Sequence, residues 1–398
     1  MADKSLSIMG GLVFDGVSEE PSAHPVHTRD GVIVSLEGPP PADAEIIEAD
    51  GCLVTPGFLD LHFHAYAVSL DARELEGLPL SYVTAKAAQR LKAALGRGFT
   101  TVRDVAGGDI GLQMAIDQGL LAGPRYLFSG PGLSQTGGHG DMRPGHLRGG
   151  STCSHLCEVV DGVEPLRTVV RDRFRTGAHV IKLFTSGGVF SPTDPLRNPQ
   201  YSVDEVAAVC YEASVRGSYV AAHAYSPEAI IHSVANGVRT IEHGNLLDEE
   251  SAALMVERDA YLVPTLGCYD SMDRRGDQLG LPPVSQVKNR EVLRRGLDSI
   301  WIARQAGVKI GLGTDLMGDL ENDQLFEFRT RCQVDEVADV LRSATSVNAD
   351  IVGRPDLGAI REGAAADLVV LDGNPFDRPE ALWTAQRTVV QSGKVVFP

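Results

Sequence analysis

Short apolar segments recur along the middle of the chain, and stretches with apolar residues at helical spacing separate them. This alternation is typical of parallel βαβ units, so we expect eight β-strands with helices between them. Tyr82–Arg97 and Ser202–Arg216 show the helical spacing. The predicted strands are Val54–His62, Phe99–Val105, Arg125–Gly130, His179–Phe184, Tyr219–His223, Thr240–His243, Tyr261–Pro264 and Lys309–Gly313.

Eight such units within roughly 300 residues predict an α/β fold, a TIM (β/α)8 barrel with insertions. Both ends of the chain instead alternate apolar and polar residues, as half-buried antiparallel strands do. We therefore assign residues 56–354 to a barrel that carries the catalytic site. Residues 1–55 and 355–398 together are predicted to form one small β-sandwich domain.

Composition narrows the class of protein and of partner. The formal net charge of −17 over 398 residues, with no basic stripe, argues against nucleic acid and anionic membranes as partners. No apolar stretch approaches the length of a membrane span, and no basic region followed by an apolar one opens the chain. We expect a cytoplasmic protein that acts on a small-molecule substrate.

Side chains that bind metals stand at the carboxyl ends of several predicted strands. Catalytic groups of such barrels lie at these ends, and His62 and His64 share one side because strand side chains alternate. Imidazole nitrogen and carboxylate oxygen are ligands for zinc and similar ions. The full set at this rim is His62, His64, Lys182, His223, His243 and Asp315.

Lys182 is the unusual member of this set, because an ammonium group beside two cations would be repelled. A desolvated, uncharged amine can instead react with carbon dioxide and give a carbamate that bridges two metal ions. A bridging oxygen ligand suits two ions about 3.5–4 Å apart. The alternative for Lys182 alone is a barrel lysine paired with a carboxylate; the histidines around it favour the carbamate.

Taken together, these residues resemble the amidohydrolase superfamily over essentially the whole chain. The C-terminal run Leu357-Gly-Ala-Ile-Arg-Glu-Gly-Ala-Ala-Ala-Asp-Leu-Val-Val-Leu also matches the segment by which members return to their β-sandwich. The resemblance implies two divalent ions, with zinc expected and cobalt, manganese or iron as alternatives. It places His62, His64 and Asp315 on one ion, His223 and His243 on the other, and carboxylated Lys182 between them.

Two further motifs are similar to one group within the superfamily. Ser134-Gln-Thr-Gly-Gly-His139-Gly-Asp-Met-Arg143 and His223-Ala-Tyr225 resemble binuclear, imidazolonepropionase-like Xaa-Pro dipeptidases, carboxypeptidases and ochratoxin hydrolases. By resemblance, His139 helps to polarise the scissile carbonyl, Tyr225 contacts a substrate carboxylate, and the protein forms a homo-oligomer. Arg143 is a second candidate for the carboxylate on chemistry alone. Without the family, His139 could cap a turn and Tyr225 could be a rim aromatic.

The predicted function is metal-dependent hydrolysis of an amide bond in a dipeptide or N-acyl amino acid with a free carboxylate. A metal-bridging hydroxide attacks, and Asp315 acts as proton shuttle. The alternative is hydrolysis of a cyclic amide, lactone, imidazolone or carbamate at the same centre. A non-catalytic scaffold is disfavoured because the ligand set is complete. Arg103 and Asp104 are predicted to form a structural ion pair near the rim.

Overall fold

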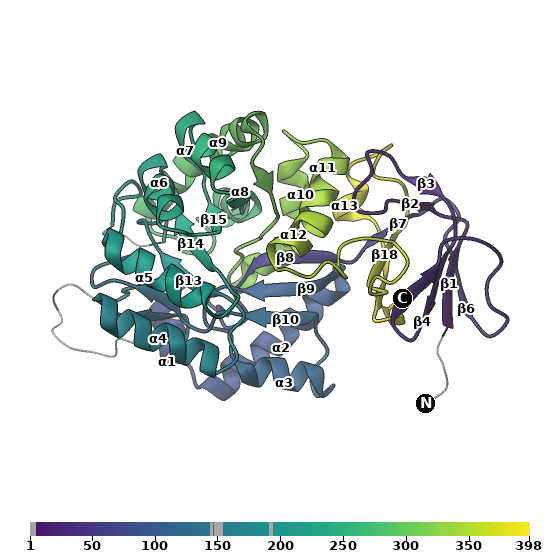
Figure 1. Cartoon of the computed structure of the whole chain (residues 1–398), viewed down its shortest axis with the longest axis horizontal. Coiled ribbons are helices and arrows are strands. Elements are labelled where there is room, and N and C mark those ends of the chain that lie inside the picture. Colours follow the sequence, from purple (N-terminus) through teal and green to yellow (C-terminus); the bar gives the residue numbers. More distant parts are fainter. Residues whose placement is uncertain (1–4, 144–145, 147–153, 191–193) are drawn as a thin grey trace.

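The computed structural model describes residues 5–143, 146, 154–190 and 194–398 of the chain (Figure 1). Its centre is built from parallel strands at the predicted positions. The sheet orders are β10-β9-β8 and β12-β11-β13-β14-β15-β16-β17. The strands are β8 (Phe58–Phe63), β9 (Phe99–Asp104), β10 (Arg125–Phe128), β11 (Gly132–Ser134), β12 (Cys157–Val159), β13 (Ile181–Phe184), β14 (Val220–Ala224), β15 (Thr240–His243), β16 (Tyr261–Val263) and β17 (Lys309–Ile310).

Backbone hydrogen bonds connect the two parallel sheets at both of their junctions. The His179 amide donates to the Phe128 carbonyl over 2.8 Å, between the third and fourth predicted strands. The Leu61 amide donates to the Leu312 carbonyl over 3.0 Å, between the first and the last. The strands therefore neighbour one another in the order in which the sequence predicts them.

Helices lie on the outside of the parallel strands and cover their apolar side chains (Figure 1). The helices α2 and α5 confirm the two predicted helical segments, and Ser202 caps α5 through a capping box with Glu205. The helices are α1 (Ala72–Gly77), α2 (Leu80–Gly96), α3 (Ile110–Asp117), α4 (Val163–Arg175), α5 (Val203–Ser214), α6 (Pro227–Ala235), α7 (Glu249–Glu257), α8 (Leu266–Arg275), α9 (Pro283–Ala306), η1 (Gly318–Asp323), α10 (Phe326–Arg331), α11 (Val337–Arg342), η2 (Ser343–Val347), α12 (Asn348–Ile351) and α13 (Ala381–Thr384).

The first predicted strand, Val54–His62, is wrong as a single strand. The structure divides it at Gly57 into β7 (Leu53–Pro56), which pairs antiparallel with β18, and β8, which pairs parallel with β9. A Cβ atom at Gly57 would lie 2.2 Å from the Thr100 Oγ1, so only glycine allows the chain to pass there. Both strands are buried, so their residues form one apolar run, and the sequence pattern gives no sign of the break between them.

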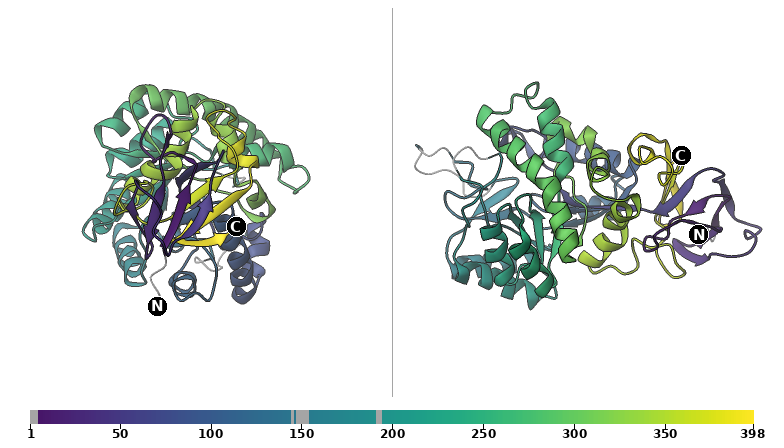
Figure 2. Two further views of the ribbon diagram at one scale, coloured as in Figure 1. Left: turned by 90° about the vertical axis from the view of Figure 1, so that its right-hand side faces the viewer. Right: turned by 90° about the horizontal axis from the view of Figure 1, so that it is seen from above.

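The two ends of the chain meet beside the parallel strands (Figure 2). One sheet has the order β5-β4-β1-β6, and the other has the order β20-β19-β18-β7-β2-β3. Apolar side chains of both sheets, including Leu6, Ile33, Val54 and Leu368, share one buried cluster. The strands are β1 (Ser5–Met9), β2 (Leu12–Val13), β3 (Ser22–Ala23), β4 (Val26–Arg29), β5 (Val32–Ser35), β6 (Glu45–Glu48), β18 (Leu368–Leu371), β19 (Arg387–Gln391) and β20 (Lys394–Phe397).

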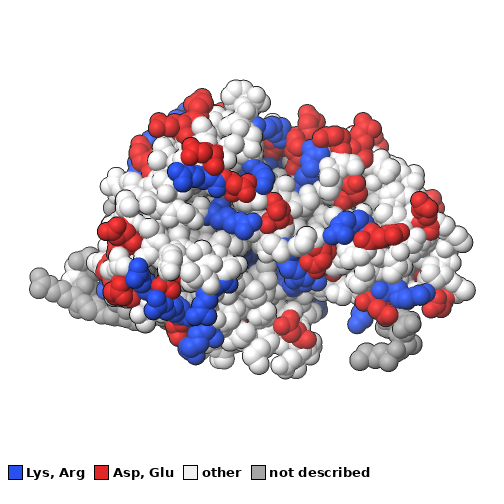
Figure 3. All heavy atoms as spheres, viewed as in Figure 1, with Lys and Arg blue, Asp and Glu red and all other residues white. Residues whose placement is uncertain are grey.

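One face of the molecule carries charges of both signs. Lys and Arg side chains alternate with Asp and Glu side chains over the face shown in Figure 3. Among the described residues, no helix is both long enough and apolar enough to cross a lipid bilayer.

Candidate metal centre

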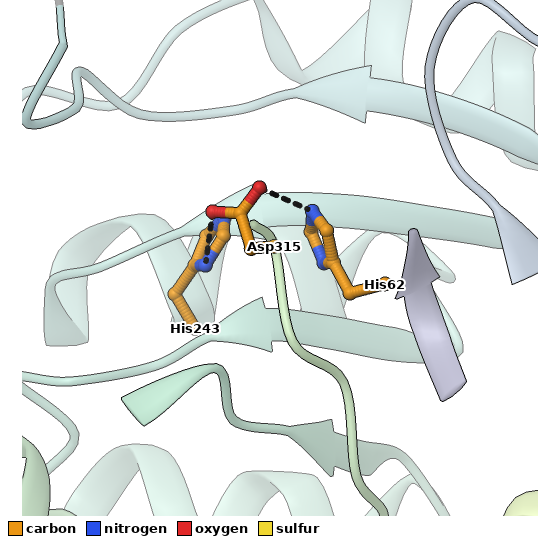
Figure 4. A group of neighbouring side chains, drawn as sticks. All are labelled: His62, His243 and Asp315. Atoms are coloured by element: carbon orange, nitrogen blue, oxygen red, sulfur yellow. Dashed lines mark ion pairs between the residues drawn. The ribbon is translucent and has the colours of Figure 1, made fainter. Parts of the chain in front are cut away.

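The structure brings all six predicted metal ligands to one end of the parallel strands. His62 and His64 lie at the end of β8, Lys182 on β13, His223 on β14 and His243 on β15; Asp315 follows β17. Figure 4 shows the Asp315 carboxylate between the His62 and His243 rings. One potential ligand atom from each of these three residues lies within 4.8 Å of the others.

His62, His64 and Asp315 form the first half of the cluster. The Asp315 Oδ1 lies 3.0 Å from the His64 Nε2 and 3.6 Å from the His62 Nε2. Asp315 has a φ of 52°, and its amide donates to the His62 carbonyl over 2.7 Å, which fixes the carboxylate beside the first strand. Gly313 permits this approach, because a Cβ atom there would lie 2.5 Å from the His62 Cβ.

His223 and His243 form the second half. The His223 Nδ1 and the His243 Nε2 are 2.9 Å apart, and both rings are buried. Burial, helped by the charge of Lys182, lowers the pKa of His223 well below 6.5 and that of His243 to about 3, although Asp315 acts to raise the pKa of His243. Both rings are therefore neutral near pH 7, and each can offer a lone pair to a cation.

Lys182 has a buried amine that interacts electrostatically with residues of both halves, including His62 and His243. Among the described residues its Nζ has no hydrogen-bond partner, and it stands 5.6 Å from the centroid of the Phe184 ring. Burial lowers the pKa of Lys182 to about 8, against the opposing charges of Glu242 and Asp315. A buried amine without a partner is costly, so this site calls for a further group.

These residues fit two divalent ions. Zinc binds imidazole nitrogen at about 2.0–2.1 Å, so two ligands of one tetrahedral ion stand about 3.3 Å apart. The nitrogen–oxygen and nitrogen–nitrogen distances within the two halves, 3.0, 3.6 and 2.9 Å, are close to that spacing. Burial also lowers the pKa of His62 well below its usual value, with a contribution from Lys182, so its Nε2 is available as a ligand.

Buried polar groups beneath the ligands were not predicted from the sequence. Glu242 accepts a hydrogen bond from the His62 Nδ1 over 2.8 Å, and Asp60 accepts one from the His62 amide over 3.1 Å. Both carboxylates interrupt apolar strands next to predicted ligands, and that interruption is the signal that could have revealed them. The predicted pair of Arg103 with Asp104 is wrong: Arg103 pairs with Glu242 at 2.8 Å.

Asp104 instead accepts hydrogen bonds from a backbone amide and a tyrosine hydroxyl. The Ala65 amide and the Tyr126 hydroxyl each donate to it over 2.7 Å. Side chains of adjacent strand residues point to opposite faces, so Arg103 and Asp104 cannot readily face each other on β9.

His139 and Tyr225 lie against the second half of the cluster. The His139 ring stacks on the His223 ring with a centroid distance of 4.4 Å, and its Nδ1 is 3.3 Å from the Asp194 Oδ2. The Tyr225 ring stacks on the His243 ring at 5.0 Å, and its hydroxyl is 2.6 Å from that of Tyr269.

Arg143 is not brought into this cluster in the part of the chain that the structure describes. Its Nε and Nη2 both donate to the Asp141 carboxylate, each over 2.7 Å, in a bidentate pair. The side chain is 29% exposed, so the guanidinium stays accessible from outside. Its predicted contact with a substrate carboxylate stays a prediction.

Comparisons with known proteins define the family. The model of the Amidohydrolase family matches residues 53–396, and the chain belongs to this family. It is 32% identical over 303 residues to the ochratoxinase of Aspergillus niger, an alignment that covers 71% of this chain and 62% of that protein. The chain thus spans less than two thirds of the length of that curated relative.

Solved structures extend the similarity to nearly the whole chain. A prolidase complexed with N-methylphosphonate-L-proline is 42% identical, with a TM-score of 0.95 and 99% of both chains covered. A Xaa-Pro dipeptidase with bound methionine is 28% identical, with a TM-score of 0.89 and coverage of 99% of this chain and 100% of that one. These relatives confirm the group that the sequence motifs resemble, and they imply a TIM barrel for the parallel strands.

Proposed function

We propose that this protein is a binuclear metal-dependent hydrolase of an amide bond in a small substrate that carries a free carboxylate. The observation that carries the proposal is the unpartnered Lys182 amine buried among four imidazoles and the Asp315 carboxylate. The relatives named prolidase, Xaa-Pro dipeptidase and ochratoxinase support hydrolysis of this kind. A dipeptide or an N-acyl amino acid is the proposed substrate.

The proposed centre holds two zinc ions. His62, His64 and Asp315 would bind one ion, His223 and His243 would bind the other, and Lys182 as its carbamate would hold both. When bound, the ions would make a hydroxide nucleophile available near neutral pH and would polarise the substrate carbonyl.

The residues around that centre have separate proposed tasks. Asp315 takes the proton of the attacking nucleophile and gives it to the departing amine. Burial acts to raise the pKa of Asp315, but the hydrogen bond from His64 and the charge of nearby Lys182 outweigh it and hold this pKa below the usual value. Its carboxylate is therefore ionised at neutral pH and ready to accept a proton. His139 donates a hydrogen bond to the carbonyl oxygen as negative charge develops there.

The arrangement of the strands supports a division into two domains. We propose that the eight parallel strands close into a TIM barrel over residues 56–354. The two end sheets then form a β-sandwich from residues 1–55 and 355–398. The hydrogen bonds between β8 and the segment after β17, and the apolar cluster shared by the end sheets, support this division.

A hydrolysis panel tests the reaction. N-acyl amino acids and dipeptides should be cleaved, whereas cyclic amides, lactones, imidazolones and carbamates should not. Asp315→Asn should lower kcat by at least about 100-fold with zinc still bound, because general acid–base catalysis contributes about 10²–10⁴-fold. Asp298→Asn, on the exposed face of α9, is the matched control. Full activity of Asp315→Asn would refute the proton transfer, and cleavage of the cyclic substrates alone would refute the substrate class.

Arg143→Met tests recognition of the substrate carboxylate. The guanidinium would have to exchange its bidentate partner Asp141 for the substrate. We therefore expect KM to rise about tenfold or more for acidic substrates, in line with a charged hydrogen bond worth about 1.5–3 kcal/mol. Neutral amide analogues of the same substrates should keep their KM, and an equal loss on both would exclude this role.

A further inference from the structure

Glu242 is fully buried, and both of its carboxylate oxygens are engaged. The Oε2 accepts a hydrogen bond from the His62 Nδ1 over 2.8 Å. The Oε1 accepts hydrogen bonds from the Arg103 Nη2 over 2.8 Å and from the Thr240 hydroxyl over 2.6 Å. A carboxylate is a good metal ligand, but these three donors hold Glu242 in the layer beneath the proposed ions.

Arg103 anchors this arrangement to the strand that carries His62. Its Nε donates over 2.7 Å to the carbonyl of Leu61, the residue before His62. Its Nη2 holds Glu242, which in turn holds the His62 ring. Arg103 is itself fully buried, so the guanidinium balances the charge of the carboxylate within the interior. One side chain thus fixes both the backbone and the ring of the ligand.

The hydrogen bonds of the other three imidazoles on this side go to neutral oxygen atoms, although the His243 Nδ1 also lies 3.8 Å from the Asp315 Oδ2. The His64 Nδ1 faces the Ala106 carbonyl at 3.3 Å, and the His223 Nε2 faces the Gly187 carbonyl at 3.2 Å. The His243 Nδ1 lies 2.8 Å from the Thr265 hydroxyl. A carboxylate partner fixes the tautomer of a metal-binding histidine and raises its basicity more than a neutral partner does.

We infer that Glu242, held by Arg103, is a positioning residue that makes the His62–His64–Asp315 group the tighter of the two metal sites. Because the His62 Nδ1–H group donates a hydrogen bond to Glu242, the lone pair of the ring is on Nε2, on the side of Asp315. The preference between the sites is thus built into the layer beneath the ligands. This inference rests on the proposed binuclear centre.

Zinc titration of metal-free protein tests it. Zn²⁺ is added in competition with a chelating indicator, so that two binding steps are resolved and their affinities measured. In Glu242→Gln the tighter step should weaken about 10–100-fold, the usual effect of losing such a partner, whereas the other step should change less than about threefold. Glu242→Asp keeps the charge and should restore part of the affinity.

Asp335→Asn is the control for the loss of a buried ion pair as such. Asp335 pairs with Arg331 at 2.6 Å away from the metal ligands, and both side chains are buried. This variant should unfold at a lower temperature and keep both zinc affinities. Equal weakening of both steps in Glu242→Gln, or no weakening, would overturn the inference and leave the binuclear centre standing. A wild-type protein that binds no zinc would overturn both.

A measurement on the wild type decides the question if Glu242→Gln does not fold. Long-range ¹H–¹⁵N correlation of the zinc-loaded protein reports which ring nitrogen of His62 carries the proton. The inference requires the proton on Nδ1, with His62→Gln providing the assignment. A metal-bound Nδ1 would exclude Glu242 as its partner.

Discussion

Burial lowers the pKa values of four nitrogen groups in this proposed site. The pKa values of His62 and His223 lie well below 6.5, that of His243 is about 3, and that of Lys182 is about 8. Each pKa falls because the interior cannot solvate the cation that protonation would give. These three imidazoles are therefore neutral and open to a divalent ion at neutral pH, whereas Lys182 still holds its proton in most molecules below about pH 8.

Gly188 leaves the space that the His139 ring occupies. A Cβ atom at Gly188 would lie 2.2 Å from the His139 Cε1, so Gly188→Ala must displace that ring. If His139 donates to the developing oxyanion, kcat should fall about 10²–10³-fold, with both metal ions retained. Steady-state kinetics and elemental analysis on the same sample measure the two quantities.

The control for Gly188→Ala is Gly77→Ala, because apart from the adjoining residues and the helix backbone no atom of the described residues lies within 4 Å of the Cβ position there. The double variant with His139→Ala should be no slower than His139→Ala alone, since both changes remove the same contact. Additive losses would show that Gly188 acts through another part of the site.

A buried carboxyl group on one of the helices should make the stability of the protein depend on pH. Glu327 on α10 accepts a hydrogen bond from the Gly267 amide at the start of α8, and burial raises its pKa to about 8. The folded-state pKa of Glu327 lies above the unfolded value of about 4.5. The contribution of this group to the stability of the folded state is therefore complete below pH 4.5 and is lost as the pH rises towards 8.

Glu327→Gln should remove this pH dependence, because the amide resembles the protonated acid. The free energy of unfolding of the wild type should fall relative to the variant by up to about 1.4 kcal/mol per pH unit between pH 4.5 and 8. Urea unfolding of metal-free protein at several pH values measures the difference. Parallel curves for the two proteins would contradict the prediction, and Glu257→Gln on the exposed end of α7 is the control.

The sequence predicts most of the parallel strands, and it places the candidate ligands on them, for a physical reason. Buried parallel strands are short apolar runs, and a histidine or lysine at the end of such a run is conspicuous. The strands β11 and β12 were missed because each has only three residues, GLS and CEV, which are too short and too polar to stand out as an apolar run. The partner of Arg103 could not be predicted either, because Glu242 lies on β15 and only the folded strands bring it close.

Over the whole molecule, the proposed ions should contribute to stability as well as to catalysis. The proposed ligands come from strands spread along most of the parallel sheets, so the ions would bind the folded chain and not the unfolded one. At a free zinc concentration of 100 times Kd, each site should add about 2.7 kcal/mol.

Chelation should therefore lower the Tm of the protein, and readdition of Zn²⁺ should restore it. Differential scanning calorimetry of native, chelated and reconstituted samples measures the change. His243→Asn should show a smaller difference between the zinc-loaded and metal-free forms than the wild type does. An unchanged Tm after complete metal removal would contradict the prediction.

The hydrogen bond from the Asp315 amide to the His62 carbonyl, 2.7 Å long, joins segments that are far apart in the sequence. Such a contact forms only after a large loop of chain has been closed, which is slow. We therefore expect the first proposed metal site to be assembled late in folding. Added zinc should leave the refolding rate almost unchanged and should slow unfolding, because the ions would stabilise the native state and not the transition state.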